Sequence, residues 1–184
     1  MNTKVEIILG CMFSGKSTEL LRRCKCYHAI GKKILLINHT FDSRTDDSIL
    51  THDGTKHVAL KLSYLMDLLH NKTYRDLLYS SSVIGIDEGQ FFNDLLEFVK
   101  AVERLNKIVI IAGLDGDSER KPFGKLLQCI PLCDSVVKLT ALDMIKKDGT
   151  PAIFSKRIKE DNKSRVLVGG KDLYKAVSRE NYLG

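Results

Sequence analysis

The stretch Gly10-Cys11-Met12-Phe13-Ser14-Gly15-Lys16-Ser17 decides the fold, because it has the pattern G-x-x-x-x-G-K-[ST] of a phosphate-binding loop. Such a loop needs a strand before it and a helix after it. The apolar residues 5–9 predict the strand, and the good helix formers of residues 17–30, followed by Gly31, predict the helix. Backbone N–H groups of this loop and the helix N-terminus point at phosphate oxygens. Lys16 is expected to reach the β- and γ-phosphates, and Ser17 to ligate Mg²⁺.

Apolar strands and helices alternate along the following residues, which predicts an α/β fold: a P-loop parallel sheet flanked by helices. Further strands are expected at residues 32–38, 82–87, 107–112 and 135–139. Helices are expected at residues 62–70 and after Asn93, which is the predicted cap. The polar residues 39–57 predict a long functional loop. We expect a nucleotide-binding domain over residues 1–140 and a small β-rich C-terminal lobe over 141–184, with strands at 152–157 and 165–168.

Composition limits the class of protein. The chain has 184 residues, enough for one domain with a sizeable core and a small appendage. No apolar run reaches the length of a membrane span and no signal peptide is evident, so we expect a cytoplasmic protein. The net charge of +6 suits an anionic ligand and also suits nucleic acid, so charge alone leaves both open. The five cysteines have neither the spacing of a metal site nor that of a disulfide framework.

Asp87-Glu88-Gly89-Gln90 follows the strand predicted at residues 82–87. In a P-loop protein, an Asp at the end of such a strand is the second group directed at Mg²⁺. Glu88 beside it is poised to accept a proton from a nucleophile or to orient a water molecule. A solvated acidic turn is the alternative interpretation, and the presence of the phosphate-binding loop favours the functional one.

Three other groups of residues are candidates for ligand contacts. Asp42 and Arg44 lie in the long polar loop, as a phosphate contact or as a solvated pair of charges. Arg120 and Lys121 follow the strand predicted at residues 107–112, near the carboxyl edge of the sheet where ligands bind. An aromatic wall for a flat base needs at least one ring near these sites, and the candidates, each more often a core residue, are Phe91, Phe92 and Phe123.

Taken together, these motifs resemble those of the type II thymidine kinase family. The matching stretches occur in the family's order and cover nearly the whole chain: residues 12–20, 51–53, 83–92, 114–116, 120–124, 136–141 and 168–170. P-loops are widespread, whereas the blocks DEGQFF (87–92) and RKPFG (120–124) behind one are highly specific.

The resemblance implies transfer of the γ-phosphate of ATP to the 5′-hydroxyl of thymidine, giving thymidine monophosphate and ADP. It implies Glu88 as general base, with Lys16 and Arg44 as further catalytic residues, and Ser17 and Asp87 as Mg²⁺ ligands. The implied ATP-binding residues are Gly10, Cys11, Met12, Phe13, Ser14, Gly15, Lys16, Ser17, Asp42, Ser43, Arg44, Asp87, Glu88, Gly89 and Gln90. The implied nucleoside-binding residues are Met12, Phe91, Leu114, Ser118, Phe123 and, in a lasso-like loop, Arg165, Val166, Leu167, Val168, Gly169 and Tyr174.

The resemblance also implies a homotetramer whose partners are thymidine and ATP, without a membrane or nucleic-acid partner. The chain departs from the family at its structural zinc site, where the four cysteine positions read Asp143, Lys146, Ser178 and Asn181. A tetrahedral structural zinc needs thiolate or imidazole ligands, so we expect no zinc. Cys11 replaces the family's usual Pro, and Ser118 stands where a Phe is common, which leaves the substrate range less defined than the reaction.

Three other functions compete with this interpretation. Another P-loop phosphotransferase or NTPase, such as a nucleoside kinase of broader range, has the same loop. A nucleic-acid-binding module would use the basic surface and would leave the loop unexplained. A homologue that binds nucleotide without catalysis is the third, and the retained Lys16, Asp87 and Glu88 argue against it.

Overall fold

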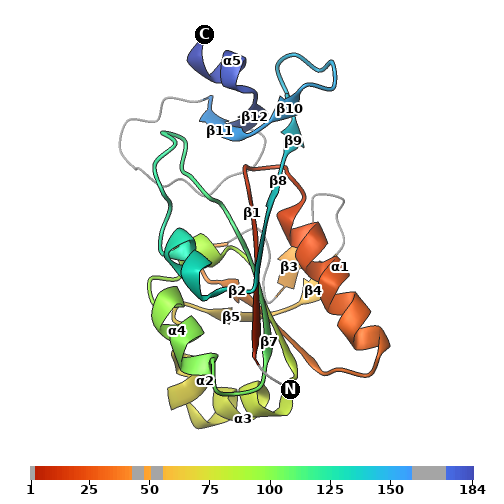
Figure 1. The fold of residues 1–184 in the computed structure, drawn as a ribbon, viewed down its shortest axis with the longest axis vertical. Helices are drawn as coiled ribbons and strands as arrows, with labels where there is room; N and C mark the ends of the chain where they lie inside the picture. Colours follow the sequence, from red (N-terminus) through yellow and green to blue (C-terminus); the bar gives the residue numbers. More distant parts are fainter. Residues whose placement is uncertain (1–2, 43–47, 51–55, 159–172) are drawn as a thin grey trace.

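A six-stranded parallel sheet forms the centre of the protein. The structure is a computed structural model that describes residues 3–42, 48–50, 56–158 and 173–184. The strand order is β5-β2-β6-β7-β1-β8, and all five neighbouring pairs are parallel (Figure 1). The strands are β1 (Lys4–Gly10), β2 (Ile34–His39), β5 (Leu60–Leu62), β6 (Val83–Ile86), β7 (Ile108–Gly113) and β8 (Ser135–Leu139). The predicted α/β class is confirmed.

Helices cover both faces of this sheet. Along β1, the side chains of Val5, Ile7 and Leu9 join the core on one face, and Ile8 joins the core on the other. The first face packs against α2 (Asp67–His70), α3 (Lys72–Ser80), α4 (Leu95–Val102) and the 3-10 helix η2 (Leu126–Leu132). The second face packs against α1 (Lys16–Ala29), on the opposite side of the sheet in Figure 1. Because both faces are covered, β6 and β7 are buried along their whole length.

The prediction of a helix at residues 62–70 is confirmed only for Asp67–His70 and is wrong at its start. Leu60–Leu62 is the edge strand β5, in which Leu60 pairs with Ile37 of β2, and only Asp67–His70 is helical. A short leucine-rich run fits a strand as well as a helix, so its periodicity could not separate the two. Asn71 then ends α2 with extended backbone angles, and its side chain accepts a hydrogen bond from the backbone N–H of Thr73 at 3.0 Å, which caps α3.

Two further predictions need correction. Asp94, rather than Asn93, is the N-cap residue of α4, and its Oδ2 accepts from the backbone N–H of Met66 at 2.8 Å instead of capping the helix. The segment predicted as one loop, residues 39–57, contains the strand β3 (Ser48–Leu50) and the start of its antiparallel partner β4 (Lys56–Val58). Residues 43–47 and 51–55 of that segment lie outside the described residues.

After β8 the chain forms a small C-terminal lobe, by which we mean the described residues 141–158 and 173–184. Two antiparallel pairs build it: β9 (Ala141–Leu142) with β10 (Pro151–Ala152), and β11 (Phe154–Arg157) with β12 (Tyr174–Val177). The predicted strand 152–157 is thus interrupted at Ile153, and the one at 165–168 lies outside the described residues. The helix α5 (Arg179–Leu183) ends the chain, and the lobe lies above the carboxyl ends of β1 and β8 (Figure 1).

Candidate active site

The loop between β1 and α1 has the strained backbone of a tight anion-binding turn. Gly10, Phe13 and Gly15 have positive φ angles of 154°, 64° and 83°. A Cβ on Gly10 would lie 2.5 Å from Ser14 Oγ and 2.6 Å from the carbonyl oxygen of Leu139, so only glycine fits there. For a bulky residue such as Phe13 the left-handed region costs about 1–2 kcal/mol. Strain of this kind concentrates at functional sites.

Two side chains of the phosphate-binding loop (residues 10–17) donate hydrogen bonds to the backbone of the same loop. The carbonyl oxygen of Cys11 accepts hydrogen bonds from Ser14 Oγ and from Lys16 Nζ, both at 2.8 Å. Burial lowers the pKa of Lys16, while the nearby carboxylates of Glu88 and Asp87 act in the opposite direction. The Lys16 ammonium is therefore held over the loop, close to the acids that follow β6.

Ser17, on the first turn of α1, meets Asp87 at the end of β6. Ser17 Oγ donates to Asp87 Oδ1 at 3.0 Å, although the two residues are 70 positions apart in the sequence. Asp87 is 2% exposed. The structure thus brings together the two residues that the sequence predicts as magnesium ligands. A hydroxyl and a carboxylate are hard oxygen donors, which fit Mg²⁺.

Glu88 and Gln90 are joined to each other and to β7. Gln90 Nε2 donates to Glu88 Oε2 at 2.6 Å, and Gln90 Oε1 accepts from the backbone N–H of Leu114 at 2.9 Å. Gln90 is 2% exposed, and its amide oxygen and nitrogen are both engaged. Glu88 has a left-handed φ of 54°, which directs it away from the course of β6. Gln90 thus ties the Glu88 carboxylate to the carboxyl end of the neighbouring strand.

Two glycines make room for Gln90. A Cβ on Gly124, where φ is 63°, would lie 2.0 Å from the backbone oxygen of Gln90. A Cβ on Gly113 would lie 2.6 Å from Gln90 Oε1. Gly124 ends the RKPFG block, so that block is needed at least in part to seat the DEGQ turn. The packing of Gly124 on Gln90 thus joins the two blocks that carry the family resemblance.

Five aromatic rings gather beside this turn. The Phe91 and Phe123 rings meet edge to face with 5.5 Å between centroids. His39 stacks on Phe41 at 4.9 Å and meets the buried Phe92 edge-on at 4.6 Å, and burial lowers its pKa. The structure therefore brings together Phe91 and Phe123, two of the predicted nucleoside-binding residues. Sequence reasoning missed His39 and Phe41; their one signal was their place at the carboxyl end of β2, the ligand edge of such sheets.

Other predicted site residues lie elsewhere or outside the described residues. Asp42 is buried, and its Oδ2 accepts from Asn38 Nδ2 at 2.8 Å, so its carboxylate faces the end of β2. Tyr174 lies on β12, largely buried. The backbone N–H of Met12 donates to Ser155 Oγ at 3.0 Å, and no local sequence pattern predicts this contact. Ser43 and Arg44, and all of Arg165, Val166, Leu167, Val168 and Gly169, lie outside the described residues.

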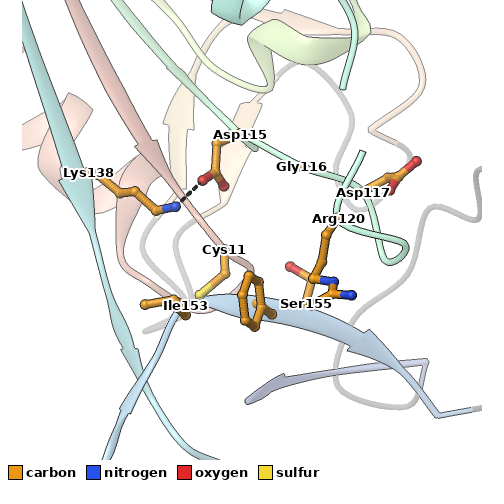
Figure 2. A pocket seen from close by; sticks show the side chains of 9 residues that line it. Cys11, Asp115, Gly116, Asp117, Arg120, Lys138, Ile153 and Ser155 are labelled. Atoms are coloured by element: carbon orange, nitrogen blue, oxygen red, sulfur yellow. Dashed lines mark ion pairs between the residues drawn. The ribbon is translucent and has the colours of Figure 1, made fainter. Parts of the chain in front are cut away.

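A cavity of about 160 Å³ lies beside the phosphate-binding loop (Figure 2). It is lined by Cys11, by residues 115–117 with Arg120, by Lys138, and by residues 153–155. Lys138 and Asp115 form an ion pair across it. Burial raises the pKa of Cys11, so this residue lines the cavity as a neutral thiol. Residues 115–117 and Arg120 of this lining belong to the β7–η2 loop (residues 114–125), in which Leu114 directly precedes and Ser118 directly follows residues 115–117.

The four positions that correspond to the family's zinc cysteines do meet in space, but as hydrogen-bonding groups. Asp143 accepts from the side chain of Asn181 and from the backbone of Ser178, and Lys146 Nζ pairs with Glu180 at 2.7 Å. A lysine ammonium and an amide donor do not fit a zinc ligand set. Within the described residues, no group of three or more His, Cys, Asp or Glu side chains is arranged to hold a metal ion.

The strand–loop–helix unit, together with the hydrogen bond from Ser17 to Asp87, defines a P-loop nucleotide-binding protein. The model of the thymidine kinase family matches residues 3–182. The chain belongs to the thymidine kinase family.

Poxvirus proteins are among its relatives. The thymidine kinase of Vaccinia virus (strain Ankara) is 44% identical over 180 residues, which is 98% of this chain and 97% of that protein. The thymidine kinase of Monkeypox virus is 42% identical over 179 residues, with 97% and 96% covered. A crystal structure of a DNA replication initiation factor superposes with a TM-score of 0.47 and 12% identity, covering 74% of this chain and 40% of that chain. In the described part of the chain, no helix has the length and hydrophobicity needed to cross a bilayer.

Replacing Gly124 by alanine should destabilise the protein by about 2–4 kcal/mol, because the new methyl group would overlap the Gln90 backbone. Gly31→Ala is the matched control. Gly31 has a similar φ of 77°, but nothing lies within 4 Å of its Cβ position, so only the backbone cost of about 1 kcal/mol is expected. Urea unfolding measures both variants, and equal losses would show that Gly124 does not seat Gln90.

Proposed function

We propose that this protein transfers the γ-phosphate of ATP to the 5′-hydroxyl of thymidine, giving thymidine monophosphate and ADP. The observation that carries this proposal is the position of Glu88. It directly follows Asp87, which contacts the phosphate-binding loop through Ser17, and it is tethered by Gln90. This position supports Glu88 as a proton acceptor for a hydroxyl that attacks a phosphate held by the loop. Membership of the thymidine kinase family favours thymidine as the acceptor.

The phosphate-binding loop would hold the triphosphate. The backbone N–H groups between Gly10 and Ser17 and the N-terminus of the 14-residue helix α1 favour anionic oxygens. Lys16, whose ammonium now donates to the carbonyl of Cys11, would exchange that partner for phosphate oxygens. Asp42, Ser43 and Arg44 are proposed as further ATP contacts on the basis of the family resemblance, with Arg44 stabilising charge during transfer.

Ser17 and Asp87 are the residues that would hold Mg²⁺. The ion, when bound, would neutralise charge on the β- and γ-phosphates. The hydrogen bond between these two side chains preorganises both oxygens on one side of the loop. Asp87 is buried, so little solvent competes for its carboxylate.

Glu88 is proposed as the general base and Gln90 as the residue that positions it. The 5′-hydroxyl would give its proton to the Glu88 carboxylate as its oxygen attacks the γ-phosphorus. The Gln90 amide donates to one oxygen of that carboxylate and so restrains its orientation. The burial of Gln90 favours this supporting role, and the ATP contact that the family resemblance implies for Gln90 stays a prediction.

The thymine base is proposed to bind between the aromatic residues and the C-terminal lobe. The rings of Phe91 and Phe123 lie edge to face, and Leu114 and Ser118 belong to the loop that starts at the end of β7. The family resemblance adds Met12 and Tyr174 and the lasso residues 165–169.

We also propose a cytoplasmic homotetramer; the exposed edge strand β8, with Val136 42% exposed, offers apolar surface for assembly. Light scattering after size exclusion tests the tetramer.

A panel assay tests the reaction. The protein is incubated with ATP, Mg²⁺ and each deoxynucleoside in turn, and the products are identified by mass. We expect ADP and thymidine monophosphate in equal amounts, with thymidine the preferred acceptor. ATP hydrolysis that does not depend on any nucleoside would instead support the rival NTPase. Salt-dependent DNA binding without turnover would support the nucleic-acid-binding alternative.

Glu88→Gln should keep ATP binding and lower kcat by about 10²–10⁴-fold, because the amide cannot accept the proton. Glu103→Gln, an exposed residue next to α4, is the control and should leave kcat unchanged. ATP binding is followed by calorimetry. Near-normal turnover of the Glu88 variant removes this residue from the mechanism.

Gln90→Met should also lower kcat, by roughly tenfold or more, because the Glu88 carboxylate loses its tether. If Gln90 acts through Glu88, the same change made in the Glu88→Gln background should have almost no further effect. Steady-state kinetics of the two single variants and the double variant measure this coupling. Effects that multiply would mean that Gln90 acts only through general stability.

A further inference from the structure

The buried carboxylate of Asp143 is the centre of a cluster that joins two distant segments. Its Oδ1 accepts from the backbone N–H groups of Ile145 at 2.8 Å and Lys146 at 3.0 Å. Its Oδ2 accepts from the backbone N–H of Ser178 at 2.7 Å and from Asn181 Nδ2 at 2.8 Å. We call Asp143 and these four donors the clasp. The two segments lie 35 residues apart in the sequence at the Asp143–Ser178 contact.

The clasp is electrostatically complete without a metal ion. Burial by itself would raise the pKa of Asp143, but the hydrogen bonds from Ser178, Lys146 and Asn181 outweigh it and hold the pKa well below its usual range. The carboxylate is therefore charged at neutral pH and accepts two N–H donors on each oxygen. Since these donors occupy the carboxylate, a cation would have to displace them in order to bind.

The clasp fixes the start of α5, which has only five residues. So short a helix is not stable by itself in water. Ser178 is its N-cap residue, and its hydroxyl accepts from the backbone N–H of Asn181 at 3.4 Å. On the other side, Lys156 of β11 donates to the carbonyl oxygen of Asn181 at 2.7 Å. Tertiary contacts therefore determine where α5 lies.

From α5, Tyr182 reaches the β7–η2 loop. Its hydroxyl donates to the carbonyl oxygen of Ser118 at 2.7 Å. The guanidinium of Arg120 lies 4.4 Å from the centre of the Tyr182 ring and 5.6 Å from that of Phe154. Arg120 has a left-handed φ of 64°, a conformation that needs such contacts to persist. The loop is thus held from outside by α5 and β11.

The same loop borders the cavity beside the phosphate-binding loop. Asp115, Gly116, Asp117 and Arg120 form one side of that cavity, and Cys11 and Ser155 lie on others (Figure 2). A continuous chain of contacts therefore runs from Asp143, through α5 and Tyr182, to the loop that carries Ser118.

We propose that Asp143 does in this lobe what a structural metal ion does in others, and that it positions the β7–η2 loop for nucleoside binding through Tyr182. The second half of this inference rests on the proposed function, because it takes the loop to be part of the nucleoside site. Asp143 and Tyr182 are positioning residues: neither touches the reacting atoms.

Two substitutions test the two ends of this path, by which we mean the chain of contacts from Asp143 through Tyr182 to the β7–η2 loop. Asp143→Asn keeps the shape but replaces an oxygen that accepts two hydrogen bonds by a donor. Tyr182→Phe removes only the hydroxyl that holds Ser118 and keeps the ring under Arg120. Each should raise the thymidine KM by roughly three- to tenfold, the effect of one lost hydrogen bond, and leave the ATP KM within about twofold. A general loss of structure would raise both KM values or lower the amount of active enzyme.

The double variant shows whether the two residues act along one path. If Asp143 acts through Tyr182, Tyr182→Phe should add little to the thymidine KM of the Asp143→Asn enzyme. Asp76→Asn on the surface of α3 and Tyr64→Phe, a residue that is 56% exposed, are the matched controls. Independent, multiplying effects contradict the path. If Asp143→Asn does not fold, Tyr182→Phe decides alone, and an unchanged thymidine KM in that variant overturns the proposal.

A metal test requires no turnover. The thermal midpoint of the wild-type protein should stay within about 1 °C after incubation with EDTA or with added Zn²⁺, whereas Asp143→Asn should lower it by several degrees. A midpoint that falls with EDTA overturns the metal-free clasp. If the wild-type enzyme does not phosphorylate thymidine, the proposed function fails, and the midpoint experiment still decides the clasp.

Discussion

The contact between Ser17 and Asp87 is the interaction on which the arrangement of the site depends. It joins the first turn of α1 to the end of β6, although β7 lies between β6 and β1 in the sheet. The contact is possible because parallel strands end at the same edge, and because Gly10 lets the chain turn sharply where a Cβ would collide with Ser14 and Leu139. Once α1 and β6 are fixed in this way, Glu88 is held beside the phosphate-binding loop.

The strain in this region is distributed over few positions. Phe13, Glu88 and Arg120 all have left-handed φ angles, and each belongs to the phosphate-binding loop, the acidic turn or the β7–η2 loop. Isolated, each conformation costs of order 1 kcal/mol or more. Contacts support each region: Ser14 and Lys16 donate to the carbonyl of Cys11 within the phosphate-binding loop, Gln90 anchors the acidic turn to Leu114, and Tyr182 lies against Arg120. Residues outside the phosphate-binding loop therefore help to maintain the geometry of this region.

The sequence predicted the sheet well, because buried parallel strands are apolar runs and the phosphate-binding loop fixes their direction. It also predicted the approach of Ser17 to Asp87 and of Phe91 to Phe123. It failed at β5, where a short leucine-rich stretch carries no distinguishing period, and it did not predict α3, which starts after the break at Asn71. It missed Ser155 and Tyr182, because a backbone contact with a residue far along the chain has no local signature. The role of Gln90 became visible only with Leu114 beside it.

The C-terminal lobe shows why a metal ion and a carboxylate can serve the same purpose there. A structural metal ion draws several ligands to one centre and so links two distant turns through a charge. Asp143 reverses the polarity: the charge belongs to the protein, and four N–H groups from two distant turns converge on it. Removing one ligand from a metal site weakens the binding of the ion that all the other ligands share, whereas losing one N–H donor weakens the clasp by a single hydrogen bond. Such a lobe can keep Tyr182 against the β7–η2 loop without depending on the supply of any metal, and its weak point is the single carboxylate on which both turns converge.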